Sequence, residues 1–152
     1  AEELKKRGFK LVAGGTKNHL IVADVQSSFG IEGDVAEKAL DKVGLNLNKN
    51  SIPNDPLPPF RPSGIRLGTP AITTRGLKED DMVKVAEWMK QALDAREDDK
   101  KLAAIHDEVI AFSRKFPIPS DSSKCGCDCK CDETDPSKKC KCGETCKCEL
   151  PQ

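Results

Sequence analysis

Several kinds of residue are scarce in this chain. None of its 152 residues is Tyr, one is Trp and two are His, which excludes a phenolic acid or base and argues against a multi-histidine metal site. The 25 basic and 25 acidic side chains cancel, so no net charge attracts nucleic acid or an anionic membrane. No apolar run approaches the ~20 residues that cross a bilayer. We therefore expect a soluble protein with one domain and with neither nucleic acid nor membrane as a partner.

Cysteine is absent from the first 124 residues, and all eight cysteines lie between Cys125 and Cys148. The segment between body and cysteines begins Pro-Ile-Pro-Ser-Asp-Ser-Ser at Pro117, a composition that blocks helix continuation and favours turns. The sequence predicts three parts, a body over residues 1–117, a linker over 118–124 and a cysteine-rich tail over 125–152.

The N-terminal residues predict a short helix that ends at Gly8. No residue that could cap this helix precedes it, and no signal-peptide pattern is visible. We expect the chain to be a fragment of a longer protein with a segment upstream of Ala1.

The body alternates between two apolar patterns. Alternating or continuous apolar character predicts strands over residues 9–13, 19–25, 45–48 and 65–68. Apolar residues at helical spacing predict helices over 35–43 (capped by Asp34, with Val35, Ala39, Leu40 and Val43 on its apolar face), 77–93 and 102–116. Five prolines predict a stiff loop over residues 49–64. Short strands between helices predict a small α/β or α+β fold.

Arg66 stands between Gly64 and Gly68 in one of the predicted strands. A planar guanidinium binds a carboxylate through two parallel hydrogen bonds, and the flanking glycines leave backbone room for a ligand. The pattern makes Arg66 a candidate for binding an acidic ligand. From the residues alone, a surface salt bridge is the commoner use of such an arginine.

Four stretches of the body together resemble one known family. They are Ala13-Gly-Gly-Thr16 with Asn18-His-Leu20, then Asn48-Lys-Asn-Ser-Ile-Pro-Asn-Asp-Pro56, then Ser63-Gly-Ile-Arg-Leu-Gly-Thr-Pro-Ala71, and Thr73-Thr-Arg-Gly76. In order and spacing they are similar to the C-terminal domain of serine hydroxymethyltransferase, the pyridoxal-phosphate enzyme that interconverts serine and glycine with tetrahydrofolate. The resemblance covers the body and implies the small C-terminal domain of a fold-type I pyridoxal-phosphate enzyme.

The resemblance also implies roles for two residues. Arg66 would hold the carboxylate of serine or glycine, and Asn50 would contact the folate pteridine. The family's cofactor-bearing lysine, which follows a Thr-rich run and a His, is nowhere in this sequence. We therefore expect no catalytic residue in this chain, pyridoxal phosphate bound mainly by an upstream part, and an inactive isolated chain. The family further implies a cytoplasmic homodimer or higher assembly.

Two alternatives stay open at this point. Asn50 can instead cap its own backbone in a turn. The body can belong to another pyridoxal-phosphate enzyme of the same fold type, which the Asn-Lys-Asn-Ser stretch disfavours.

The tail is built from Cys-X-Cys units, with cysteines at Cys125, Cys127, Cys129, Cys131, Cys140, Cys142, Cys146 and Cys148. Thiolates at this spacing bind zinc, copper(I) or cadmium, and eight sulfurs suffice for two tetrahedral zinc sites. The density of Cys-X-Cys is similar to that of metallothioneins. Disulfides are the alternative, which a cytosolic setting disfavours. The tail therefore also allows a different function for the chain, that of a non-catalytic metal-binding protein.

Overall fold

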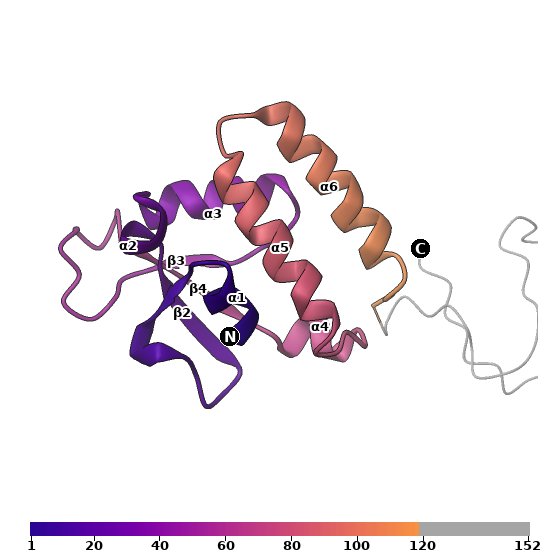
Figure 1. Cartoon of the computed structure of the whole chain (residues 1–152), viewed down its shortest axis with the longest axis horizontal. Coiled ribbons are helices and arrows are strands. Elements are labelled where there is room, and N and C mark those ends of the chain that lie inside the picture. The colour runs from indigo at the N-terminus through magenta and orange to yellow at the C-terminus, as the bar shows by residue number, and fades with distance from the viewer. Residues whose placement is uncertain (119–152) are drawn as a thin grey trace, which may run out of the picture. The chain divides into compact units, whose positions relative to one another are not determined.

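The part of the chain that the computed structural model describes, residues 1–118, contains a four-stranded antiparallel sheet (Figure 1). Its strands are β1 (Lys10–Leu11), β2 (Leu20–Asp24), β3 (Asn48–Asn50) and β4 (Gly64–Gly68), in the spatial order β1-β2-β4-β3. The predicted tail and most of the predicted linker lie outside the described residues. The boundaries proposed for them stay predictions.

Six α-helices and one 3-10 turn accompany the sheet in these residues. They are α1 (Glu2–Lys6), the turn η1 (Val12–Gly14), α2 (Val25–Phe29), α3 (Gly33–Lys42), α4 (Pro70–Thr74), α5 (Asp81–Asp94) and α6 (Asp99–Ser113). Figure 1 shows α5 alongside both α3 and α6. The mixed helix and sheet architecture confirms the predicted α/β (α+β) class.

The core lies between this helical layer, formed by α3, α5 and α6, and one face of the sheet. Leu40, Leu93 and Leu102 come from the three helices, and Ile65 comes from β4; each is at most 2% exposed. Trp88 of α5 is 2% exposed, and its Nε1 donates to Glu108 of α6 at 3.0 Å. Full burial of an aliphatic side chain contributes about 2 kcal/mol, so these residues account for much of what holds the helices to the sheet.

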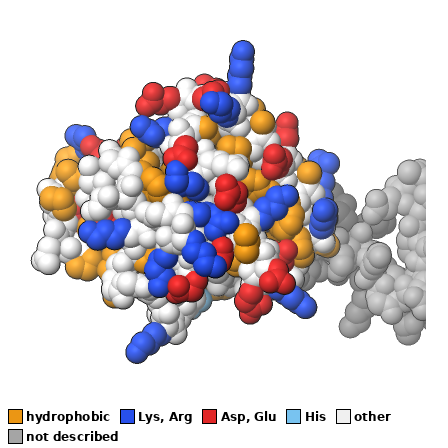
Figure 2. All heavy atoms as spheres, in the orientation of Figure 1, with side chains coloured by type: hydrophobic (Ala, Val, Ile, Leu, Met, Phe, Trp, Pro, Cys, Tyr) orange, Lys and Arg blue, Asp and Glu red, His pale blue; other side chains and the backbone are white. Residues whose placement is uncertain are grey.

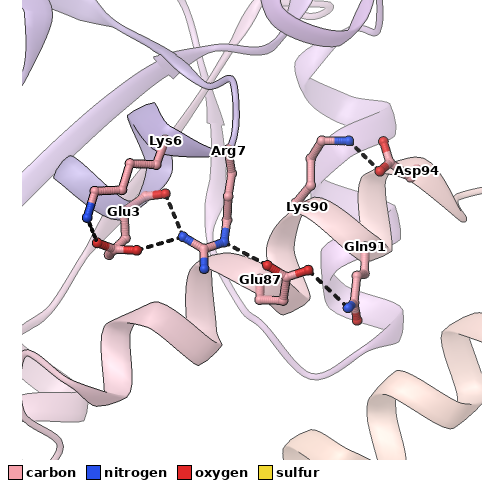
Figure 3. A network of polar contacts seen from close by, with 7 residues as sticks. All are labelled: Glu3, Lys6, Arg7, Glu87, Lys90, Gln91 and Asp94. Carbon is pink, nitrogen blue, oxygen red and sulfur yellow. Dashed lines mark hydrogen bonds and ion pairs between the residues drawn. The ribbon is translucent and has the colours of Figure 1, made fainter.

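Charged side chains attach α1 to α5 (Figure 3). The Arg7 guanidinium donates to Glu3 at 2.7 Å and to Glu87 of α5 at 2.9 Å. Both carboxylates stabilise the charged guanidinium, and their hydrogen bonds raise the pKa of Arg7. The N-terminal helix is thus held to α5 by a network that extends from Glu87 to Gln91, and a separate pair of Lys90 with Asp94 lies on the same helix.

The C-terminal end of α6 is held by Arg75, which follows α4. Its Nε donates to the carbonyl oxygen of Phe116 at 2.7 Å, and its Nη2 donates to that of Ser113 at 2.8 Å. The last carbonyls of a helix have no partner within the helix. Arg75 supplies that partner from a segment 38 residues earlier.

Two predicted strands differ from the structure. The strand predicted over 9–13 stops after Leu11, because the chain turns at Ala13, whose φ is +55°. The strand predicted over 45–48 was wrong for residues 45–47, and β3 instead occupies the start of the predicted loop. Leu45 and Leu47 pack against the core from irregular backbone, whereas Asn48–Asn50 pairs with β4.

Two short helices were not predicted. Helix α2 begins where a strand was expected to end, because the Asp24 side chain caps it by accepting from Ser27 N at 2.8 Å. Helix α4 begins at Pro70, a residue that suits the first helical position.

The three predicted helices are present with shifted bounds. In α3 the cap is Glu32 rather than Asp34, and Val35, predicted on the apolar face, is 39% exposed while Ala36 is buried. The helix begins at Gly33, whose N donates to the carbonyl of Pro62 at 2.7 Å, and Ala36 lies on the face of Ala39 and Leu40.

Candidate functional site

The two faces of the sheet have different surroundings. Successive strand residues point to opposite faces, so Ala23 and Ile65 share the face that the helices bury, and neither is exposed at all. The neighbouring cross-strand row holds Val22, Arg66 and Asn48 on the other side. Arg66 and Asn48 are exposed and Val22 is half-buried. We call the side that carries this row the open face.

Arg66 lies in the middle of β4 on the open face. Among residues 1–118 its guanidinium pairs with no acidic side chain, so the salt-bridge alternative is not realised in the described part of the chain. Its five N–H donors are therefore available to a ligand from outside these residues. The backbone on either side is held by hydrogen bonds to β2 and β3.

The glycines that flank Arg66 serve a different purpose from the one predicted. A Cβ at Gly64 would lie 2.6 Å from Ile52 Cγ2 and 2.8 Å from the carbonyl oxygen of Asn50. A Cβ at Gly68 would lie 3.1 Å from the carbonyl of His19. The space above both glycines is thus filled by the chain itself, and the prediction of backbone room for a ligand was wrong.

Asn50 is half-buried at the end of β3, opposite Gly64. Two residues from Asn48 in the same strand, it belongs to the open face with Arg66. Its Nδ2 donates to the carbonyl oxygen of Ser51 at 2.6 Å. The local turn bond considered as an alternative is therefore present, and the side chain keeps one N–H and its Oδ1 for other partners.

The loop over residues 51–63, which joins β3 to β4, is organised around Asp55. Asp55 Oδ2 accepts from Ile52 N at 3.1 Å and from Ser63 N at 3.0 Å. Asp55 Oδ1 accepts from Leu57 N at 3.0 Å and from Ser63 Oγ at 2.6 Å. Burial would raise the pKa of Asp55, but the Ser63 hydroxyl and three backbone amides stabilise the carboxylate and hold its pKa well below the usual value. Asp55 is thus charged at every physiological pH.

An ion pair attaches this loop to the start of α3, and a side-chain hydrogen bond attaches it to β3. Arg61 forms a two-pronged pair with Glu32, one arm of which joins Nε to Oε2 at 2.7 Å. Lys49 is exposed and donates through Nζ to the carbonyl of Phe60 at 3.2 Å. The loop is therefore held at several points, although Phe60 itself is 70% exposed.

Sequence reasoning singled out Arg66 and Asn50, and the structure brings both to the open face. It did not single out Asp55 or Asn48. The signal for Asp55 was the Asn54-Asp55-Pro56 tripeptide, because Asp side chains before a proline often accept from backbone amides that follow. Asn48 had no signal beyond its place in the Asn-Lys-Asn stretch.

The eight predicted metal-ligating cysteines all lie outside the described residues. Within residues 1–118, no group of three or more His, Cys, Asp or Glu side chains is placed to hold a metal ion. In the same residues no helix has the length and apolar character needed to span a membrane. Figure 2 shows acidic and basic side chains interspersed on the face in view.

Comparison with known proteins places these residues in a family. A family model for serine hydroxymethyltransferase matches residues 1–89. Serine hydroxymethyltransferases of Xanthomonas campestris pv. campestris are 50% identical over 118 residues, which cover 78% of this chain and 28% of theirs. That of Acidobacterium capsulatum is 47% identical over 118 residues, 78% of this chain and 27% of its own length. The chain thus spans little more than a quarter of the relatives it matches, and it belongs to the serine hydroxymethyltransferase family.

Proposed function

We propose that this chain supplies the amino-acid and folate side of a serine hydroxymethyltransferase, which interconverts serine and glycine with tetrahydrofolate as the one-carbon acceptor. The observation that carries the proposal is the Arg66 guanidinium, exposed on the open face and without an acidic partner among the described residues. The family match over the same segment supports it.

Arg66 in this proposal binds the substrate carboxylate through two parallel charge-assisted hydrogen bonds. A carboxylate held at two points cannot rotate, so the groups on the adjacent carbon take up a fixed orientation. Because β4 is paired on both sides, the backbone that carries Arg66 does not need to reorganise when substrate binds. The contribution of the chain to catalysis is thus orientation.

The cofactor is assigned to a different part of the enzyme. A lysine that carries pyridoxal phosphate is desolvated or lies beside another cation, which lowers its pKa. Every lysine in residues 1–118 is exposed or half-buried, so the described residues do not fit the attachment of this cofactor. When bound by the remaining part of a full-length enzyme, pyridoxal phosphate supplies the electron sink of the reaction.

Asn50 is proposed to contact the folate pteridine. One N–H of its amide is bound to Ser51, and Oδ1 with the second N–H remains for a ring that carries both donors and acceptors. Asn50 pairs with Gly64, and Arg66 lies two residues further along β4 on the same face, which supports contacts of both residues with neighbouring substrates. The family resemblance further leads us to propose a cytoplasmic homodimer or higher assembly for the full-length enzyme.

A chimera tests the proposal with the residues of this chain. Residues 1–118 replace the matching segment of the Xanthomonas relative, and serine cleavage is assayed with tetrahydrofolate. We expect the chimera to be active. In it, Arg66→Ala raises the KM for serine about 100-fold, because two charge-assisted hydrogen bonds are lost, and it also lowers kcat. Arg114→Ala, an exposed arginine at the end of α6, is the matched control and leaves both constants unchanged. Normal serine kinetics in Arg66→Ala would refute the proposed role.

A second proposed function concerns the tail. Eight cysteines within residues 125–148 are dense enough to hold zinc or another soft metal through thiolates, and Lys130, Lys141 and Lys147 offset part of their charge. In the alternative form of this proposal, the chain is a non-catalytic metal-binding protein. Zinc titration of the reduced chain followed by native mass spectrometry tests it, with a variant that carries Ser at all eight positions as the control. We expect stoichiometric uptake by the parent chain alone. Equal masses with and without zinc would refute metal binding.

A further inference from the structure

We infer that Asp55 is the positioning residue of this site, one carboxylate that fixes both the Asn50 side chain and the pairing of the strand that carries Arg66. The inference rests on the proposed function and extends it to a residue that contacts neither substrate. It follows from the hydrogen bonds of the loop over residues 51–63 and from the register of β3 with β4.

The connection from Asp55 to Asn50 passes through a single peptide group. Ser51 and Ile52 share one planar peptide, whose N–H donates to Asp55 Oδ2 at 3.1 Å. The carbonyl oxygen of the same peptide accepts from Asn50 Nδ2 at 2.6 Å. Because the peptide is rigid, the carboxylate that holds its N–H also sets the direction of its C=O. The orientation of the Asn50 amide therefore depends on Asp55.

The connection from Asp55 to Arg66 passes through strand register. Asp55 Oδ2 accepts from both Ile52 N and Ser63 N, so one oxygen atom joins the two ends of the loop. From the loop inward, the cross-strand pairs of β3 and β4 are Asn50 with Gly64, Lys49 with Ile65, and Asn48 with Arg66. Because β2 already pairs with β4 over five residue pairs, a slip of one residue in β3 would turn Asn48 and Asn50 away from the face that carries Arg66. Fixing the loop ends therefore fixes the pairing of β3 with the strand that carries Arg66.

Of the two ends of the loop over residues 51–63, only one is anchored independently of Asp55. Ser63 is 1% exposed, and its carbonyl accepts from Val25 N and Gln26 N at 3.1 Å each, so one end of the loop is anchored to α2 without Asp55. The other end, at Ser51 and Ile52, is held to it through the Asp55 carboxylate. The lowered pKa of Asp55 agrees with a charged acceptor of four hydrogen bonds.

The test uses Asp55→Asn, which replaces one acceptor oxygen by an NH2 group that faces donors. In the 152-residue chain, NMR hydrogen exchange is measured at the Ile52 and Ser63 amides and at the Asn50 side-chain amide, with Trp88 fluorescence as the check that the helical layer is folded. We expect at least tenfold faster exchange at all three groups with unchanged fluorescence. Asp98→Asn, in which an amide caps α6 as well as the carboxylate does, is the matched control and leaves the three rates unchanged.

The second arm measures kinetics in the chimera described above. We expect Asp55→Asn to raise the KM for tetrahydrofolate and for serine about tenfold each, while kcat at saturation stays within about threefold of the parent. Ser63→Ala removes the hydroxyl bond to Oδ1 and keeps the two Oδ2 bonds, so it gives a smaller rise in both constants.

The outcomes separate this inference from the proposed function. Parent-like exchange rates or KM values in Asp55→Asn, beside a large effect of Arg66→Ala, overturn the positioning role alone. Loss of the Trp88 signal in Asp55→Asn also overturns it, because Asp55 would then hold the whole domain. No effect of Arg66→Ala refutes the proposed function, and the exchange rates still decide whether Asp55 orders the loop.

Discussion

The helical layer and the loop over residues 51–63 are ordered by opposite kinds of interaction. The layer is held by apolar side chains such as Leu93 and Leu102, which are nearly inaccessible to solvent. The loop is held by a carboxylate and its four hydrogen bonds, and its Phe60 side chain is 70% exposed. The stability given by buried apolar side chains does not depend on pH but is sensitive to changes in side-chain volume. The stability given by a hydrogen-bonded carboxylate is lost when the carboxylate is protonated. We therefore expect substitutions in the helical layer to change the stability of the domain, and substitutions at Asp55 to change mainly the geometry of the loop.

The largest expected effect on stability comes from a substitution in the helical layer. Leu93→Ala removes a side chain that is 1% exposed and leaves a cavity among α3, α5 and α6. We expect it to lower the free energy of unfolding by about 3 kcal/mol, as for other buried leucines. Urea denaturation followed by Trp88 fluorescence measures the change. Val83→Ala, on the same helix and 45% exposed, is the control, and an equal loss there would contradict the assignment of the core.

Gly33→Ala tests the junction between the two regions. A Cβ at this position would lie 2.2 Å from the carbonyl oxygen of Gly64 and 2.9 Å from that of Pro62, so α3 must move away from the loop. We expect a loss of about 2 kcal/mol, the range for overpacking in a fitted interior. Lys38→Ala, exposed in the same helix, serves as the control. Unfolding midpoints that agree for the two variants would show that the contact is not needed.

As the pH falls, we expect the loop over residues 51–63 to lose its hydrogen bonds before the helical layer unfolds. The pKa of Asp55 is lowered from its usual 3.8 in the folded chain, so the stabilisation by this carboxylate is fully present above that pH. It is lost progressively as the pH falls below the usual value toward the lowered one. We expect the Ile52 and Ser63 amides to lose protection below about pH 4 while the Trp88 fluorescence is retained. Simultaneous loss of both signals would show that the regions unfold together.

The smallest expected effect is that of Arg66→Ala on stability. The side chain is exposed and has no acidic partner among the described residues, so we expect the free energy of unfolding to change by less than about 0.5 kcal/mol. The same variant is expected to disable substrate binding, which makes Arg66 a residue of function and not of folding. A loss above 1 kcal/mol in urea denaturation would place Arg66 among the structural residues instead.

Much of the fold was accessible from the sequence because its main signals are local. The apolar spacing that predicts α5 and α6 follows from the period of the helix. The chemistry of Arg66 made it a candidate, and the family resemblance gave it the carboxylate-binding role. The parts that were missed depend on distant partners. Strand β3 is the polar tripeptide Asn48–Asn50, which has no apolar alternation and is a strand only because β4 lies beside it.

The same reason explains why the role of Asp55 was not predicted. Its interactions with Ile52 and Leu57 are local turn bonds of a kind that sequence can indicate. Its bonds to Ser63 cross the loop, and they exist because the paired strands return the chain to that point. The glycines around Arg66 were misinterpreted for a related reason, since the atoms that fill their space come from Ile52 and His19.

The grip of Arg75 on the carbonyls of Ser113 and Phe116 has a consequence for how this domain can diverge. It supplies donors for the final turn of α6 from a residue near the end of α4, so these two carbonyls already have partners within residues 1–118. A change of sequence after Phe116 is therefore not expected to fray this helix end.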